Sequence, residues 1–369
     1  MNLIFITIDG ARLDRIKEGK FFKTLINKSI FFEKTITYAP YTIAAMHAIF
    51  SGTYGTKTGV NSYWSTPNFK QEQFKTLTKY LQDQEYVTIG DSINKLILPK
   101  SGFDELTIHD ELKDDLTKRH TSLISKVHQL KLNEKKFFLY LHYSNIHTGI
   151  MENVLKKFDN FNKEYFSKRD ENEKFYDTLF EKADKYLENI ISHCESLGLI
   201  DDTLIVVVSD HGISVGEKLG ERAYGVYCYD YTLNATSLFF HKILSSKYIK
   251  NQVRSIDILP TILEILKIPI DKNYRPFDGE SLIPVLSGKT LPRIAFSQSG
   301  NPLDSGKPPE SPNVWAIRTD EWKFIKNTHN NTEELYDLQN DPNELNNLID
   351  DNPEIASKLR LKLKELTIK

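Results

Sequence analysis

Short, uniformly apolar runs alternate along the chain with longer stretches of helical spacing. The apolar runs, rich in β-branched and aromatic residues, predict strands at 3–8, 86–90, 137–142 and 204–208. The helical spacing predicts helices at 42–50, 74–84, 174–197 and 256–266. Strands without polar alternation are typical of parallel sheets that are covered on both faces. The pattern therefore predicts an α/β fold, a doubly wound and mostly parallel sheet flanked by helices.

The C-terminal part of the chain follows a different pattern. From about residue 291, Pro, Ser, Gly and Asn become frequent, and short alternating runs at 314–318 and 322–326 flank a polar turn, which is typical of a hairpin. A helix is expected at 353–366. We therefore predict a large α/β domain over residues 1–290 and a small C-terminal α+β subdomain over residues 291–369, with antiparallel strands and a terminal helix.

Composition narrows the class of partner. The chain of 369 residues carries 48 Lys and Arg against 50 Asp and Glu, a formal net charge of -2. Without a basic excess, the binding of nucleic acid or of an anionic membrane surface has no electrostatic support. The apolar runs are also far shorter than the roughly 20 residues that span a bilayer. We expect a small-molecule partner, no nucleic acid and no membrane span.

The cysteines and the N-terminus bear on the compartment. Cys194 and Cys228 lack CxxC spacing and are too few for a disulfide framework, so both are expected to remain thiols. Met1 and Asn2 lead directly into the first apolar run, without the cationic start of a signal peptide. These features predict a cytoplasmic protein.

Three polar residues follow the two strongest predicted strands. Asp9 comes directly after the run 3–8, and Asp210 and His211 come just after the run 204–208. In open α/β sheets the binding crevice lies outside the carboxyl ends of the strands, so these side chains can converge. Two carboxylates and an imidazole suit a divalent cation. From spacing alone, turn or cap residues at strand ends explain the pattern equally well.

Thr42 stands at the start of the predicted helix 42–50. A hydroxyl there faces unpaired backbone N–H groups and the positive end of the helix dipole, where anions bind well. Coordination to a divalent cation would activate this hydroxyl as a nucleophile. Taken alone, the residue is also explained as an N-cap that only begins the helix.

Further along, the ordered motifs of the chain resemble the sulfatase family of the alkaline phosphatase superfamily. Residues 6–14 are similar to its opening strand and metal aspartate, and residues 42–60 to its nucleophile helix. The other similar segments are 139–147 (LHxxDPH), 202–212 (D-N-T-hydrophobic-S-D-H-G), 255–261, 278–282, 317–323 and 334–344. The likeness covers nearly the whole chain. It implies that Asp9, Thr42, Asp210 and His211 bind a catalytic divalent metal ion and that Thr42 is the nucleophile.

Departures from the family pattern shape the expected chemistry. Sulfatases carry Cys or Ser in a C/S-x-P-x-R motif that is converted to formylglycine, whereas the run from Thr42 to Met46 lacks the Pro and the Arg. A Thr at this place resembles the superfamily's phosphodiesterases and phosphotransferases. Gly10 and Asn145 replace two family aspartates, which favours one metal ion over two. Mixed carboxylate and imidazole ligands favour Mn²⁺ or Zn²⁺, with Mg²⁺ or Ca²⁺ as the alternatives.

Two more residues are candidates for contact with the substrate. His147 is expected to contact the anionic group or to protonate the leaving oxygen, with a structural role as the alternative. Arg222 follows the metal motif where the family places a substrate-binding Lys or His, so it is expected to clamp an anion; a salt bridge in an exposed loop is the alternative. His47 and His142 are expected to be core or hydrogen-bonded histidines.

These features together predict a metal-dependent phosphoester hydrolase or phosphotransferase that acts on a diester or a phosphonate monoester through a phosphothreonine. The first alternative is a sulfuric ester hydrolase that lacks formylglycine. The second is a non-catalytic anion-binding protein that has kept the fold. In either catalytic case the expected partner is a small-molecule or glycan-linked phospho- or sulfo-ester.

Overall fold

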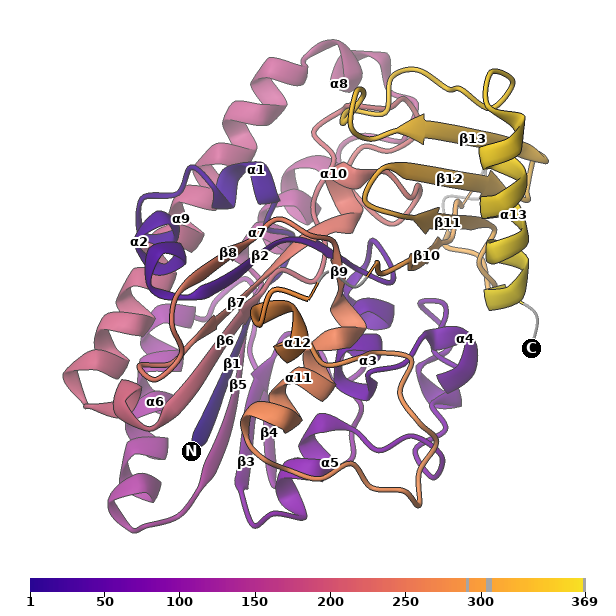
Figure 1. Cartoon of the computed structure of the whole chain (residues 1–369). Coiled ribbons are helices and arrows are strands. Elements are labelled where there is room, and N and C mark those ends of the chain that lie inside the picture. The colour runs from indigo at the N-terminus through magenta and orange to yellow at the C-terminus, as the bar shows by residue number, and fades with distance from the viewer. Residues whose placement is uncertain (290–291, 303–306, 368–369) are drawn as a thin grey trace.

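A computed structural model describes residues 1–289, 292–302 and 307–367 (Figure 1). Its large sheet has the strand order β4-β3-β5-β1-β6-β7-β2-β8, and β9 also pairs with β2. These strands are β1 (Asn2–Ile8), β2 (Ile30–Ile36), β3 (Val87–Ser92), β4 (Glu105–Ile108), β5 (Phe137–Tyr143), β6 (Thr203–Val208), β7 (Asn234–Phe240), β8 (Lys247–Ile249) and β9 (Val253–Arg254). The first five strands in this order run parallel, and β7 lies antiparallel between β6 and β2. The predicted α/β fold with a mostly parallel sheet is confirmed.

Helices cover both faces of the large sheet (Figure 1). The α-helices of the described residues are α1 (Leu13–Ile16), α2 (Lys20–Lys28), α3 (Thr42–Ser51), α4 (Gly55–Thr58), α5 (Leu77–Gln82), α6 (Leu116–Leu132), α7 (Asn145–Ile150), α8 (Lys163–Ser167), α9 (Arg169–Ser196), α10 (Asp230–Leu233), α11 (Ile258–Ile265), α12 (Ile283–Leu286) and α13 (Pro353–Thr367), of which α13 packs in the C-terminal part of the chain. The predicted helix 74–84 begins only at Leu77, because the side chain of Thr76 accepts a hydrogen bond from the backbone N–H of Lys79 and caps it.

The central strand β1 shows why its sequence lacks polar alternation. Ile4, Ile6 and Ile8 point into one core, which they share with residues of α6 and α9. Leu3 and Phe5 point into the other core, which they share with residues of α3 and α11. Because both faces are buried, the middle of the strand, Leu3 to Ile6, is uniformly apolar, and its polar residues Asn2 and Thr7 stand near the two ends.

A second, antiparallel sheet forms the C-terminal part, with β10 (Ala295–Ser299), β11 (Val314–Arg318), β12 (Trp322–Asn327) and β13 (Thr332–Asp337) in chain order. The predicted hairpin is the pair β11 and β12, and α13 is the predicted terminal helix. The apolar residues of this part share a core with Ala44 and Ala48 of α3. The predicted boundary between residues 290 and 291 falls on residues outside the described part of the chain.

Two further expectations concern cysteines and membranes. Cys194 and Cys228 are both free thiols and both buried, as their spacing predicts. Within the described ranges, none of the helices combines the length and the apolar character that crossing a bilayer requires.

Candidate active site

Asp9, Asp210 and His211 meet at the carboxyl ends of two neighbouring strands. Asp9 follows β1, and the other two follow β6; all three side chains are buried. One donor atom of each lies within 4.8 Å of the others. Nε2 of His211 is 3.5 Å from Oδ1 of Asp9 and 3.6 Å from Oδ2 of Asp210. The structure thus brings together the three candidate ligands, although about 200 residues separate Asp9 from the other two in the sequence.

The hydroxyl of Thr42 completes this group. Its Oγ1 donates to Oδ2 of Asp9 at 3.3 Å and lies 3.3 Å from Nε2 of His211. Thr42 is the first residue of α3, and Tyr41 before it has the extended backbone of the N-cap. The interpretation of Thr42 as an N-cap is therefore wrong by one residue, and its hydroxyl faces the acidic cluster.

The donor atoms fit a divalent cation. Among the described residues, Oδ1 of Asp9 and Oδ2 of Asp210 are buried without a hydrogen-bond partner. Buried carboxylate oxygens normally have partners, since an unpaired buried charge is costly. Nδ1 of His211 donates to the carbonyl oxygen of Gly212 at 2.8 Å, so Nε2 of the neutral ring presents its lone pair to the cluster. A second hydrogen bond of this kind is what orients metal-binding histidines.

The two carboxylates differ electrostatically. Burial opposes the ionisation of Asp9, but the hydrogen bond from His142 and the neighbouring histidines hold the pKa of Asp9 below its usual value. Burial and the charge of Asp9 raise the pKa of Asp210. Two carboxylates this close repel each other, and a bound cation would relieve that repulsion.

His142 belongs to the site, although the sequence interpretation left it without a named partner. It lies on β5, in register with Thr7 of β1, so its ring reaches the residue that follows β1. Nε2 of His142 is 3.1 Å from Oδ2 of Asp9, and Nδ1 is 3.4 Å from Oγ of Ser92. The ring therefore fixes the carboxylate of Asp9 from the side opposite to its unpaired oxygen. The sequence signal that could have found His142 is that a polar residue stands there within an otherwise apolar strand.

A cavity of about 220 Å³ opens onto the cluster. Its lining residues are Asp9, Thr42, Ile43, Tyr63, Ile93, Asn94, Ile97, Glu111, His147 and Tyr224. We call this space the reaction cavity. The ring of Tyr224 lies between two histidines, with ring centroids 5.0 Å from His211 and 5.7 Å from His147. Glu111 was not predicted as a member of the site, because a loop brings it there.

His147 lines the reaction cavity from α7, and its contact with the substrate stays a prediction. Its Nδ1 is 3.6 Å from Oε2 of Glu111, which is ion-pair distance but too long for a hydrogen bond. Burial disfavours the charged ring, but the carboxylates of Asp9 and Glu111 outweigh it and raise the pKa of His147. The ring is therefore suited to carry a proton beside the cluster.

Arg222 lies in a second cavity, of about 550 Å³, that we call the outer cavity. Tyr63 and Tyr224 line both cavities, so the two spaces adjoin. Nη1 of Arg222 donates to Oδ1 of Asn160 at 2.5 Å, and Nη2 to the carbonyl oxygen of Leu155 at 3.4 Å. The guanidinium is thus placed beyond the reaction cavity, and its role in binding substrate stays a prediction.

The ligand assignment predicts a loss of metal in one variant. Asp210→Asn keeps the shape of the side chain but removes the charge, and we expect the metal content of the purified protein to fall from one ion per chain to a small fraction. Elemental analysis after dialysis measures this. Asp201→Asn, on an exposed carboxylate paired with Lys242, is the matched control. Full metal content in the Asp210 variant would contradict the assignment.

Comparison with known proteins places this site in a family. The family model described as Sulfatase matches residues 2–268, and the model described as N-sulphoglucosamine sulphohydrolase, C-terminal, matches residues 236–369. The fold is that of hydrolases of the alkaline phosphatase-like superfamily. The chain belongs to the sulfatase family.

Individual relatives agree with this assignment. The chain is 28% identical over 198 residues to arylsulfatase K of Bos taurus, covering 52% of this chain and 36% of that protein. It is 27% identical over 173 residues to choline-sulfatase of Rhizobium meliloti, covering 45% and 30%. The matches thus span about a third of the length of these curated relatives.

Solved structures share the fold over almost the entire chain. One is a protein in complex with its substrate D-glucosamine-2-N,6-O-disulfate, with a TM-score of 0.75, 17% identity and 99% of this chain and 97% of that chain covered. Another is the phosphonate monoester hydrolase of Silicibacter pomeroyi, with a TM-score of 0.74, 17% identity and 99% and 94% covered. Because sulfate and phosphonate hydrolases both have this fold, the fold alone does not choose the ester.

The expected phosphoester hydrolase or phosphotransferase is wrong by these comparisons. The family and the curated relatives are sulfatases, and a structural neighbour binds a sulfated sugar. The expectation gave too much weight to Thr42. A residue at the nucleophile position supplies the attacking atom, whereas the choice between sulfur and phosphorus depends on how the whole cavity matches the charge of the transferred group.

Proposed function

We propose that this protein hydrolyses sulfate esters with an unmodified threonine in its active site. The observation that carries the proposal is that Asp9, Asp210, His211 and Thr42 meet in one buried cluster of a sulfatase-family chain, and that Asp9 and Thr42 of this cluster line the reaction cavity. The substrate class is a small-molecule or glycan-linked sulfate ester. Sulfated ligands of structural neighbours support this choice.

The chemistry of residue 42 explains why the proposed reaction does not use formylglycine. Formylglycine derives from Cys or Ser, and neither stands here; Met46, which occupies the place of the motif's Arg, is buried. The side chain of Thr42 therefore attacks as a hydroxyl. Its Oγ1 loses its proton to solvent and forms a bond to sulfur while the bond from sulfur to the leaving oxygen breaks. The leaving oxygen takes up one proton, so the step gives a threonine sulfate ester and an alcohol.

A second step releases the product. Threonine sulfate lacks the second hydroxyl by which a hydrated aldehyde expels sulfate, so water must attack sulfur. That attack breaks the bond between sulfur and Oγ1, restores Thr42 and releases hydrogen sulfate. We assign to His147 the proton that the leaving oxygen takes up in the first step. His147 lines the reaction cavity, and neither Lys nor Arg is among the residues that line it.

We further propose that one divalent ion is held by Asp9, Thr42, Asp210 and His211. Imidazole ligation favours Mn²⁺ or Zn²⁺, and Mg²⁺ or Ca²⁺ are the alternatives. When bound, such an ion supplies positive charge for the sulfate oxygens and for the two carboxylates. Gly10 makes a backbone contact instead of a second carboxylate contact: its N–H donates to Oδ1 of Asp210 at 3.3 Å.

Arg222 is the residue that we propose for binding the remote part of the substrate. The outer cavity adjoins the reaction cavity, so a leaving group bonded to the sulfate at Thr42 would extend toward it. Arg222→Ala is expected to raise KM about tenfold with a smaller effect on kcat, because the contact is the same in ground and transition states. Arg222→Lys is the matched variant, because it keeps the positive charge but not the planar guanidinium group. An unchanged KM would place substrate elsewhere.

The proposed function is tested directly by sulfate release. The metal-loaded protein is incubated with aryl, alkyl and sugar sulfates, and inorganic sulfate is measured. In parallel, the mass of the peptide that contains Thr42 is measured in protein that has not met substrate, and we expect the mass of unmodified threonine. Absence of turnover on every sulfate ester would refute the proposal.

A further inference from the structure

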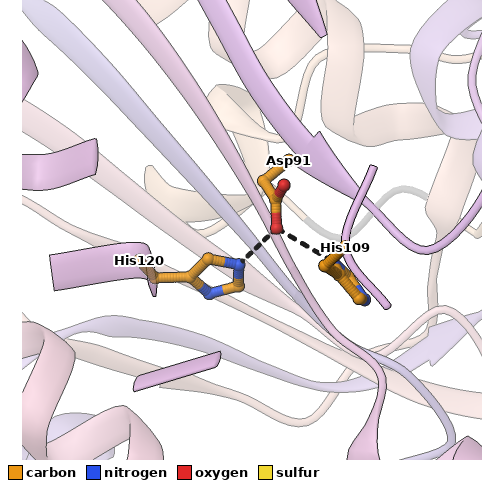
Figure 2. A group of neighbouring side chains, drawn as sticks. All are labelled: Asp91, His109 and His120. Atoms are coloured by element: carbon orange, nitrogen blue, oxygen red, sulfur yellow. Dashed lines mark hydrogen bonds and ion pairs between the residues drawn. The ribbon is translucent and has the colours of Figure 1, made fainter. Parts of the chain in front are cut away.

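A second buried group of titratable side chains lies at the end of β3, outside the reaction cavity. Asp91, His109 and His120 form it, and none has exposed side-chain surface (Figure 2). Oδ2 of Asp91 accepts hydrogen bonds from Nδ1 of His109 at 2.8 Å and from Nε2 of His120 at 3.0 Å. Two histidines and a carboxylate suggest a metal at first sight.

The other contacts of this group point away from a metal. Oδ1 of Asp91 accepts from Arg119, whose Nε and Nη2 lie 2.9 and 2.8 Å away, and from Oγ1 of Thr107 at 2.6 Å. The guanidinium already neutralises the carboxylate, and every side-chain nitrogen and oxygen of the three residues has a partner. The cluster at Asp9 is different, because two of its oxygens are buried without one. The group at Asp91 is therefore a complete hydrogen-bond network.

One arm of this network leads to the reaction cavity. Nε2 of His109 is 2.9 Å from Oγ of Ser144, the residue directly before α7. The carbonyl oxygen of Ser144 accepts from the backbone N–H of Thr148 at 2.9 Å, which closes the first turn around His147. His109 thus holds the start of the helix that presents His147 to the reaction cavity.

The other arm leads away from the cavity. Nδ1 of His120 is 2.6 Å from the hydroxyl of Tyr186, a residue of α9. The two histidines are therefore matched: both contact the same oxygen of Asp91, both are buried, and each binds one hydroxyl with its remaining nitrogen. Only the hydroxyl bound by His109 belongs to the segment that carries a residue of the reaction cavity.

We propose that His109 is a positioning residue: clamped by Asp91, it anchors Ser144 and so sets the place of α7 and His147. The segment that carries His109 makes a second contact of the same kind. Oε2 of Glu111 accepts from Oγ1 of Thr148 at 2.8 Å and lies 3.6 Å from Nδ1 of His147. The part of the inference that concerns turnover rests on the proposed function. The part that concerns the position of α7 does not.

Two matched variants separate this role from general stability. His109→Asn keeps an amide nitrogen at the place of Nδ1, so it retains the contact with Asp91 and loses the contact with Ser144. His120→Gln keeps a nitrogen at the place of Nε2, so it retains the contact with Asp91 and loses the contact with Tyr186. Each variant leaves one buried hydroxyl without its partner, so comparable losses of Tm are expected.

Amide hydrogen exchange over residues 145–150 is the readout that does not depend on activity. We expect His109→Asn to accelerate exchange there about tenfold and His120→Gln to leave it unchanged. In turnover, His109→Asn should lower kcat/KM for an alkyl sulfate about tenfold, since small displacements of a reacting group are costly, and His120→Gln by less than about twofold. In a protein that already carries Ser144→Ala, His109→Asn should have no further effect, because both changes remove the same contact, that between His109 and Ser144.

Three results would overturn the inference: equal exchange over 145–150 in both variants, equal losses of kcat/KM in both, or a second metal ion per chain that His109→Asn and His120→Gln both remove. If the unaltered protein turns over no sulfate ester, the proposed function fails, and the exchange measurement still decides whether His109 anchors α7.

Discussion

Thr42→Val is expected to lower kcat for sulfate esters by at least about a thousandfold while the protein stays folded. Valine has the shape of threonine without the hydroxyl, and the side chain of residue 42 is largely buried, so its packing is kept. The lost group is Oγ1, which faces Asp9 and His211 at 3.3 Å. Steady-state kinetics and a thermal melt of the metal-loaded variant measure the two effects.

Thr42→Ser is the matched control for this prediction, because it keeps a hydroxyl at the same carbon. We expect it to retain most of the turnover. Rapid acid quenching of the unaltered protein during turnover should also yield a sulfated peptide that contains Thr42. Full activity in the valine variant would assign the attack to water and would show that the hydroxyl of Thr42 is needed neither as nucleophile nor as metal ligand.

His147→Gln is expected to reduce turnover by an amount that depends on the leaving group. A general acid contributes about a hundredfold to ten-thousandfold where the leaving oxygen needs a proton, and little where it does not. We therefore expect losses in that range for alkyl and sugar sulfates and less than about threefold for 4-nitrophenyl sulfate. Equal losses across leaving groups would show that His147 binds the sulfate and does not deliver a proton.

The convergence of Asp9, Asp210 and His211 could be predicted from the sequence because it depends on where single strands end. Asp9 and Asp210 each follow an uninterrupted apolar strand, and parallel strands end at one edge of the sheet. His142 shares that edge, but its partner is set by the register of β5 against β1, which no local pattern reveals. Likewise, Arg222 lies on a loop whose course depends on tertiary contacts, such as the hydrogen bond to Asn160.

Of the large sheet, only the parallel strands β1, β3, β5 and β6 were predicted, and the edge strand β4 and the strands beyond β6 were not. β2 escaped prediction because Glu33 and Lys34 interrupt its apolar run at a register shift between Phe32 and Thr35. A bulge of this kind breaks the periodicity on which strand prediction depends. β7 mixes small polar residues with apolar ones, and its antiparallel place between β6 and β2 is set by neighbours distant in the chain. The omitted strands do not carry the cluster, so the site could be located without them.

The central claim is that the reaction cavity is matched to sulfate esters. The most direct test compares kcat/KM of the metal-loaded protein for 4-nitrophenyl sulfate, 4-nitrophenyl phosphate and bis(4-nitrophenyl) phosphate, which share one leaving group. Our account predicts the highest value for the sulfate ester. A higher value for either phosphate ester would contradict it.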